Sequence, residues 1–237
     1  MNNPVISYYN QIAKEYDASR FANTYGQFIH YQEDKYLKNA IKVHSPERIS
    51  SIGCGTGRFM ELANIGIDYS DEMLKIAQEK FPEKELICTD AAQIPLPSAS
   101  IDLSFSLHVF MHLSAKKMED ILEEVTRLTS ENGIFILDIP SAYRRNLLGD
   151  VQKNWHGASA YTLEEVKRIC GKKWEIIDYQ GILFLPIHRF PVFSRHFFKL
   201  IDDLFCRFFF KNYASYLIFT LRKNNTLFRI YQNKIKI

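Results

Sequence analysis

Apolar positions follow two different spacings along the chain. They recur every three or four residues over 4–17 and 25–42, which predicts two amphipathic helices. Short apolar runs typical of buried strands follow at 48–52, 65–68, 86–88, 101–107, 134–137 and 174–179. Further helices are predicted at 71–80, at 115–129 and after a capping box that starts at Thr162. Strands that alternate with helices in this way indicate a parallel sheet wound on both faces.

The composition is that of a globular protein. The chain has 237 residues, of which 46% are hydrophobic and 24% charged, so collagen-like, coiled-coil and wholly disordered classes are excluded. At this length a core needs neither disulfides nor a metal. Cys54, Cys88, Cys170 and Cys206 show no short paired spacing, so no zinc ribbon or disulfide framework is predicted. Because no secretion signal or long charge-free run is found, we expect a cytoplasmic protein.

Charge is spread unevenly between the two parts of the chain. Residues 181–237 hold ten Lys or Arg against two Asp or Glu, although the whole chain carries a net charge of only +3. The same segment holds 11 of the 18 phenylalanines. This asymmetry predicts that the end of the chain meets an anionic or interfacial partner. Nucleic acid is not the expected partner, because the cations stand among apolar rather than exposed polar neighbours.

A glycine turn follows the first predicted strand. Gly53, Gly55 and Gly57 let the backbone approach a ligand and leave free N–H groups, which suits an anion. Asp68 ends the next strand, where a carboxylate in a doubly wound sheet can accept hydrogen bonds from ribose hydroxyls. Asp90 follows the third strand and is placed to contact a base. The spacing therefore predicts a nucleoside-containing ligand, although a solvated strand end is the alternative for both aspartates.

The dinucleotide-binding fingerprint fits this turn poorly. It requires a third glycine where the chain has Arg58, and an acidic residue further along than Asp68. Ordered motifs instead resemble the class I S-adenosylmethionine-dependent methyltransferases, in the small-molecule branch related to ubiquinone and menaquinone biosynthesis. The segments that carry this resemblance are 49–59, 66–74, 89–97, 101–113 and 132–138, with 16–21 resembling the family's N-terminal cover. A nicotinamide-dependent dehydrogenase is accordingly disfavoured.

The resemblance implies S-adenosylmethionine as the cofactor and S-adenosylhomocysteine as its product. The matching cofactor-binding positions are Gly53, Cys54, Gly55, Gly57, Asp68, Tyr69, Met73, Asp90, Ala91, Ala92 and Ser106. By this resemblance Asp68 would hold the ribose, Asp90 would meet the adenine amino group, and Ser106 would lie near the methionine amino group.

Ser51 departs from the family's pattern. The family usually carries Asp or Glu at this position, where the carboxylate helps to neutralise the cofactor's ammonium group. Serine offers an acceptor without charge, and charge-assisted hydrogen bonds are about twice as strong as neutral ones. We therefore expect weaker cofactor binding or a compensating contact elsewhere. The alternative function is a catalytically inactive cofactor-binding module at a membrane surface or in a complex.

Methyl transfer places few demands on catalytic side chains. Because the reaction is an in-line displacement with a good leaving group, positioning can supply most of the acceleration. A general base is needed only when the acceptor must lose a proton, and His108 is the candidate, with a structural histidine as the open alternative. Tyr16 and His156 are candidates for contact with the acceptor, a small or lipid-linked molecule, although a plain loop is the alternative for His156. No metal site is predicted.

An insertion interrupts the predicted end of the sheet. The last two strands are expected within 176–185 and 214–221, separated by about thirty residues, more than ordinary hairpin loops contain. The helical face expected in this insertion comprises Phe193, Phe197, Ile201, Leu204, Phe205 and Phe208. Either this face buries against the domain as a lid over the acceptor pocket, which we favour, or it enters a membrane interface. Charged residues interrupt the run, so it cannot span a bilayer.

The predicted fold class is therefore α/β. We expect a doubly wound, mostly parallel seven-stranded sheet of the Rossmann-like methyltransferase type, with N-terminal cover helices and a helical insertion between the last two strands. The expected division is 1–44 for the cover helices and 45–237 for the methyltransferase domain, with the aromatic and basic insertion at about 186–212.

Overall fold

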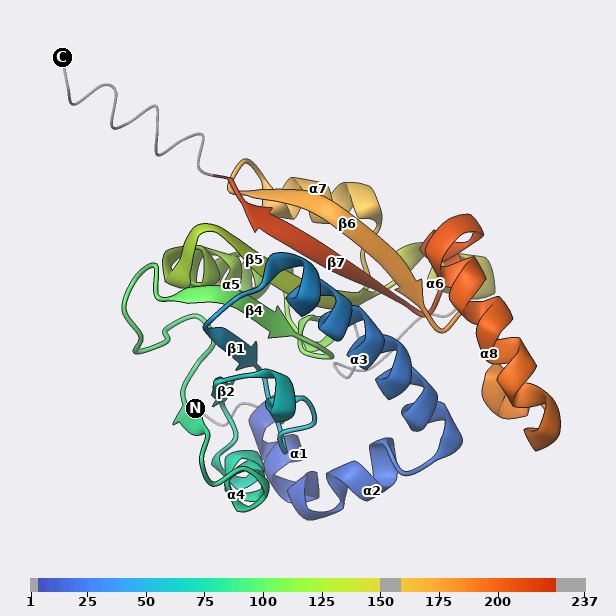
Figure 1. Cartoon of the computed structure of the whole chain (residues 1–237), viewed down its shortest axis with the longest axis horizontal. Helices are drawn as coiled ribbons and strands as arrows, with labels where there is room; N and C mark the ends of the chain where they lie inside the picture. Colours follow the sequence, from blue (N-terminus) through green and yellow to red (C-terminus); the bar gives the residue numbers. More distant parts are fainter. Residues whose placement is uncertain (1–3, 150–158, 225–237) are drawn as a thin grey trace.

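A seven-stranded sheet forms the centre of the protein in this computed structural model, which describes residues 4–149 and 159–224 (Figure 1). The strands are β1 (Ile49–Ile52), β2 (Ile65–Asp68), β3 (Glu85–Cys88), β4 (Ile101–Ser106), β5 (Thr129–Pro140), β6 (Trp174–Ile182) and β7 (Tyr216–Lys223). Their order is β3-β2-β1-β4-β5-β7-β6. The first five strands pair in parallel, and β7 runs antiparallel between β5 and β6. The predicted doubly wound, mostly parallel sheet is confirmed.

Helices cover both faces of this sheet (Figure 1). They are α1 (Pro4–Ile12), α2 (Tyr16–Arg20), α3 (Thr24–His44), α4 (Asp71–Lys80), α5 (Ala115–Leu128), α6 (Ala142–Leu148), α7 (Leu163–Cys170) and α8 (Arg195–Leu204). In β5, Ile134 packs in one core cluster with Phe28 of α3. The next residue, Phe135, packs in the opposite cluster with Ile121 of α5 and Val166 of α7. Because both faces are buried, the strand is a continuous apolar run rather than an alternating one.

Local capping explains why several helices begin where the sequence predicts. The Ser70 hydroxyl accepts a hydrogen bond from the Met73 N–H at the start of α4, and Thr162 and Glu165 form the predicted capping box of α7. The N-terminal prediction was too simple. The single helix expected over 4–17 is divided into α1, a 3-10 turn at Ala13–Glu15, and α2. Helix α6 was not predicted.

The insertion between β6 and β7 is helical, as expected. Helix α8 continues as a π-helical turn at Phe205–Phe209 before the chain returns to β7. The predicted boundary at 44/45 coincides with the end of α3 and with a left-handed Ser45, and the division into cover and body stays a prediction. Within residues 4–149 and 159–224, no helix has the length and apolarity needed to cross a bilayer.

Candidate functional site

A cavity of about 380 Å³ opens where the parallel strands end. Gly53 follows β1, Asp68 ends β2, and Asp90 and His108 follow β3 and β4, so all four come to the same edge of the sheet. Helices α1 and α2 contribute the opposite wall through Val5, Ile6, Tyr9 and Tyr16. The sequence-predicted residues that line it are Tyr16, Gly53, Gly55, Asp68, Tyr69, Met73, Asp90, Ala91 and His108.

The other predicted site residues lie outside this cavity. Cys54 lines an adjoining pocket of about 40 Å³, which shares Tyr16, Gly53 and His108 with the main cavity. Gly57, Ala92 and Ser106 line neither of the two, and His156 falls outside the described residues. Sequence reasoning missed several lining residues, chiefly from α1 and α5: Val5, Ile6, Tyr9, His112, Leu113, Lys117 and Ile121.

The glycine turn packs tightly at Gly53 and leaves open space at Gly55, which we call the Gly55 cradle. A Cβ added at Gly53, where φ is +70°, would lie 2.2 Å from Cγ2 of Val109, so no larger residue fits. A Cβ added at Gly55, where φ is +55°, would meet no atom within 4 Å. Gly55 therefore leaves room for a ligand against the backbone.

Asp68 is oriented by backbone groups on both sides. Its Oδ2 accepts a hydrogen bond of 2.8 Å from the Gly55 N–H, and its Oδ1 accepts one of 2.8 Å from the Ser70 N–H. Burial raises the pKa of this carboxyl, although these bonds favour its ionised form. A carboxylate has about four lone-pair positions, so acceptor capacity is left for ligand hydroxyls.

Asp90 has a cationic partner that the sequence did not predict. Lys117 Nζ of α5 lies 2.8 and 2.6 Å from the two carboxylate oxygens, and the Ala92 N–H donates to Oδ1 at 2.9 Å. Burial opposes ionisation of Asp90, but these hydrogen bonds outweigh it and lower its pKa. Both side chains line the cavity, so Asp90 offers a hydrogen-bond acceptor and Lys117 a donor to the polar edge of a ligand's ring.

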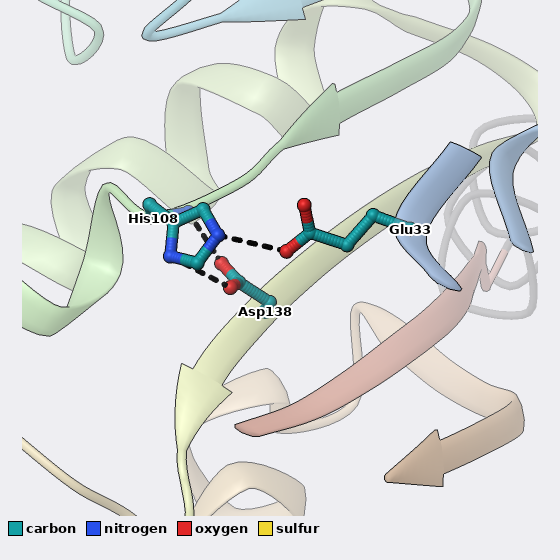
Figure 2. A group of neighbouring side chains, drawn as sticks. All are labelled: Glu33, His108 and Asp138. Carbon is teal, nitrogen blue, oxygen red and sulfur yellow. Dashed lines mark hydrogen bonds and ion pairs between the residues drawn. The ribbon is translucent and has the colours of Figure 1, made fainter. Parts of the chain in front are cut away.

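His108 lies between two buried carboxylates (Figure 2). Its Nε2 is 2.8 Å from Oε1 of Glu33 on α3, and its Nδ1 is 3.6 Å from Oδ2 of Asp138 on β5. The His108 backbone N–H donates to Asp138 Oδ1 at 2.6 Å. His108 has a left-handed backbone with φ of +60°, which a non-glycine residue adopts at a cost. We call Glu33, His108 and Asp138 the acid–imidazole cluster.

The acid–imidazole cluster favours the charged form of its histidine. Burial opposes a charge on His108, but Glu33 and Asp138 outweigh it and raise the pKa of the imidazole. Burial also opposes the charge on Glu33, whose pKa is nevertheless lowered by Arg58 and His108. Asp138 differs, because its burial raises the pKa to about 6. Both acids therefore favour the protonated form of the ring that lies between them.

The same three residues bring one ligand atom each within 4.8 Å of one another, which is the donor set of a divalent-cation site. Two observations favour the imidazolium over a metal ion. The ring nitrogens of His108 face different carboxylates, and a metal can bind only one of them. Arg58 Nη2 already pairs with the second oxygen of Glu33. The two carboxylates thus already have basic partners within the protein, His108 and Arg58.

The comparisons with known proteins agree with this geometry. The family described as a methyltransferase domain matches residues 50–137. A ubiquinone/menaquinone biosynthesis C-methyltransferase (UbiE) of Campylobacter jejuni is 32% identical over 228 residues, which cover 76% of this chain and 93% of that protein. The chain belongs to the class I S-adenosylmethionine-dependent methyltransferases. The predicted methyltransferase is thus confirmed, and S-adenosylmethionine is its cofactor.

Solved structures of similar fold cover nearly the whole methyltransferase. A possible histamine N-methyltransferase of Thermotoga maritima has a TM-score of 0.64 at 20% identity, over 91% of this chain and 98% of that one. A magnesium protoporphyrin IX methyltransferase of Synechocystis, solved with bound SAH, has a TM-score of 0.64 at 16% identity, over 93% of this chain and 98% of that one. These similarities show the shared fold.

The cavity of this methyltransferase fits its cofactor chemically. Asp68 offers acceptors for hydroxyls, and the open cradle at Gly55 offers space beside the backbone. Arg58 lines the adjoining pocket, and its buried Nη1 has no hydrogen-bond partner among the described residues. An unpaired buried polar atom is costly, so this atom indicates a polar ligand group.

The aromatic insertion of the methyltransferase lies away from this cavity. Among the described residues, none from 186–212 lines it, so the lid prediction is wrong for this cavity. The apolar row of the insertion faces outward instead: Phe193, in the 3-10 turn before α8, is 90% exposed, and Phe197 on α8 is 63% exposed. We call the exposed residues Phe193, Phe197, Leu200, Leu204 and Phe208 the outward row. Ile201 and Phe205, predicted on this face, are half-buried.

Proposed function

We propose that the enzyme binds S-adenosylmethionine in the main cavity and transfers its methyl group to a small or lipid-linked acceptor. When bound, the cofactor supplies a methyl group carried on a sulfonium. Once the methyl group is transferred, the rest of the cofactor is a neutral thioether, which is a good leaving group. The convergence of Asp68, Asp90 and the Gly55 cradle in one cavity carries this proposal. Asp68 binds the ribose hydroxyls and Asp90 the adenine amino group. The apolar side chains of α1 and α5 exclude water from the site.

Positioning of the cofactor and the acceptor supplies most of the rate acceleration. A cavity that holds both reactants in line converts a bimolecular step into an effectively unimolecular one. Tyr16 contributes to the wall near His108 and is the proposed contact for the acceptor. His156 is proposed as a second contact on the strength of the sequence alone.

His108 is the proposed general base for an acceptor that must lose a proton. It can accept that proton only when its imidazole is neutral, and the acid–imidazole cluster raises its pKa above 6.5. Activity toward a hydroxyl acceptor should therefore rise with pH, with a midpoint above 6.5. His108→Asn should lower kcat by about 100-fold and remove this rise, because general-base catalysis contributes 10²–10⁴-fold.

This prediction is measured as kcat against pH, together with cofactor affinity by calorimetry. His30 is the matched control: it stacks on Phe59 outside the main cavity, and His30→Asn should keep the pH profile. Full turnover and an unchanged profile in His108→Asn would make His108 a structural residue.

The outward row is proposed to enter the surface of an anionic membrane. Both acidic residues of the insertion are used to anchor it: Gln32 Nε2 of α3 donates to Asp202 and Asp203 at 2.9 Å each. Asp202 also accepts the Phe184 N–H at 3.0 Å. Arg189 and Arg207 are exposed on the same segment. Anchored acids, exposed cations and exposed aromatics together complement anionic headgroups over an apolar boundary.

A membrane contact fits the proposed lipid-linked acceptor. One relative is named for ubiquinone and menaquinone biosynthesis, which supports an acceptor that partitions into lipid. An enzyme seated on the bilayer meets such an acceptor at a raised local concentration. Labelled methyl from S-adenosylmethionine should then appear in acceptors embedded in vesicles rather than in their water-soluble analogues.

Phe193→Ser combined with Phe197→Ser should abolish flotation with vesicles that contain phosphatidylglycerol. Burying a phenylalanine is worth about 1.5–3 kcal/mol, so each loss should weaken binding by at least about tenfold. Val43→Ser is the control, because Val43 is 66% exposed on α3 and lies outside the row. Wild-type protein that stays with the unbound fraction, and sediments as a dimer, would assign the row to a second copy of this chain.

A further inference from the structure

The adjoining pocket of about 40 Å³ extends the main cavity past the glycine turn. It shares Gly53, Gly55 and His108 with the main cavity, but Asp68 and Asp90 line only the larger one. Arg58 lines only the smaller one of these two. The acidic side chains therefore line the larger space, and the guanidinium lines the smaller one.

Arg58 is held firmly at this end but lacks one partner. Its guanidinium lies between Phe21 and Phe59, at 4.2 and 4.3 Å from their ring centroids. Nη2 pairs with Glu33, while Nη1 is buried and has no hydrogen-bond partner among the described residues. A buried donor on a charged group is costly when it is unpaired, so the site is incomplete without an acceptor.

The charges around the adjoining pocket favour an anion as that acceptor. Arg58 and His108 both line it, and no carboxylate does. The acids that balance them, Glu33 and Asp138, are fully buried behind these side chains and line neither space. Ser51, which lines the adjoining pocket, places a neutral hydroxyl where the family usually carries an acid.

We infer that Arg58 Nη1 binds the carboxylate of the cofactor's methionine end. The enzyme then binds the amino-acid end of S-adenosylmethionine through its carboxylate. This contact compensates for the ammonium group, to which Ser51 offers only an uncharged hydroxyl. This inference rests on the cofactor placement proposed above. An arginine–carboxylate bond is charge-assisted and contributes about 1.5–3 kcal/mol, which is about 10- to 100-fold in affinity.

The contacts of Arg58 also link this carboxylate contact to the N-terminal helices. Phe21 follows α2 and Glu33 lies on α3, so the guanidinium that receives the carboxylate is positioned by both segments. Asp17 of α2 accepts a hydrogen bond of 2.6 Å from the Thr56 hydroxyl in the glycine turn. Glu33 and Phe21 are therefore positioning residues for cofactor binding.

Calorimetric titration with three ligands tests the inference. S-adenosylmethionine carries the carboxylate and the amine, decarboxylated S-adenosylmethionine keeps only the amine, and 5′-methylthioadenosine lacks both. Wild-type protein should bind the decarboxylated compound about 10- to 100-fold more weakly than S-adenosylmethionine. In Arg58→Met this difference should disappear, while affinity for 5′-methylthioadenosine should change less than about twofold.

Each other outcome has a separate meaning. Equal affinity of the wild-type protein for the first two ligands overturns the carboxylate assignment, and this arm needs no variant. An Arg58→Met protein that loses all three ligands equally assigns Arg58 a structural role, and Arg58→Lys, which keeps the charge beside Glu33, should then restore all three. If Asp68→Ala leaves 5′-methylthioadenosine binding unchanged, the cofactor placement itself fails, whatever Arg58 does.

Discussion

Replacing Glu33 by alanine is expected to lower the free energy of unfolding by about 3–5 kcal/mol. Glu33 is fully buried and pairs with both Arg58 and His108. Its removal leaves the Arg58 guanidinium in a low-dielectric interior without its anion and takes from His108 one of its two acidic partners, and a buried charge without a partner is strongly destabilising. Urea denaturation of wild-type and variant protein at pH 7 measures this loss.

Asp34→Ala is the matched control for this prediction. Asp34 is the next residue on α3 and forms a partly exposed ion pair with Lys38 at 2.8 Å. Exposed pairs of this kind contribute about 0–1 kcal/mol, so the control should stay close to wild type. A Glu33→Ala variant that loses less than about 1 kcal/mol would contradict the buried ionic network.

The cost of Glu33→Ala should also depend on pH. The pKa of His108 is raised in the folded protein, so the stability contributed by this pairing is present below pH 6.5. It is lost as the pH rises through the folded-state pKa, because the imidazole then becomes neutral. The difference between wild type and variant should therefore shrink toward alkaline pH, where only Arg58 is left unpaired.

Asp68→Ala is expected to weaken binding of S-adenosylhomocysteine by about 100-fold. The carboxylate is placed by Gly55 and Ser70 to accept hydrogen bonds from ribose hydroxyls, and hydrogen bonds to a charged group contribute about 1.5–3 kcal/mol each. Two such bonds correspond to a loss of about 100-fold or more. Calorimetric titration at fixed salt measures the change.

Two variants control for indirect effects of this substitution. Asp71→Ala removes an exposed carboxylate from the first turn of α4, three residues further on, and should bind like wild type. Asp68→Asn keeps an acceptor for the Gly55 or Ser70 N–H but not the charge, so its affinity should be intermediate. Unchanged affinity in Asp68→Ala would exclude Asp68 from the ribose site.

The sequence by itself determined the sheet and the edge of the sheet at which the cavity opens. Gly53, Asp68 and Asp90 each stand at the end of one strand of a parallel sheet, so their meeting at one edge follows from local pattern and topology alone. Helix starts at Ser70 and Thr162 were equally local, because the capping side chain lies within one turn of the group that it caps.

The acid–imidazole cluster was decided by tertiary packing. Glu33, His108 and Asp138 come from α3, the end of β4 and β5, and no short motif joins them. One signal was present: Gln32 and Glu33 occupy positions on the apolar face of α3, between Ile29 and Tyr36. A charged residue at a buried helical position indicates a partner in the core, but only the packing of α3 on the sheet identifies that partner.

Which face of the insertion helix is exposed could also not be predicted from the sequence. Periodicity predicted a helix with one apolar face, and the interpretation that we favoured buried this face as a lid. In the structure, Asp202 is buried and bonded to Gln32 and to the Phe184 N–H, so its side of α8 faces the domain, while Phe197 on the same helix is exposed. Local pattern thus determined the elements and the glycine and aspartate edge of the sheet, whereas long-range pairing of buried polar groups decided the surroundings of His108 and the outward face of α8.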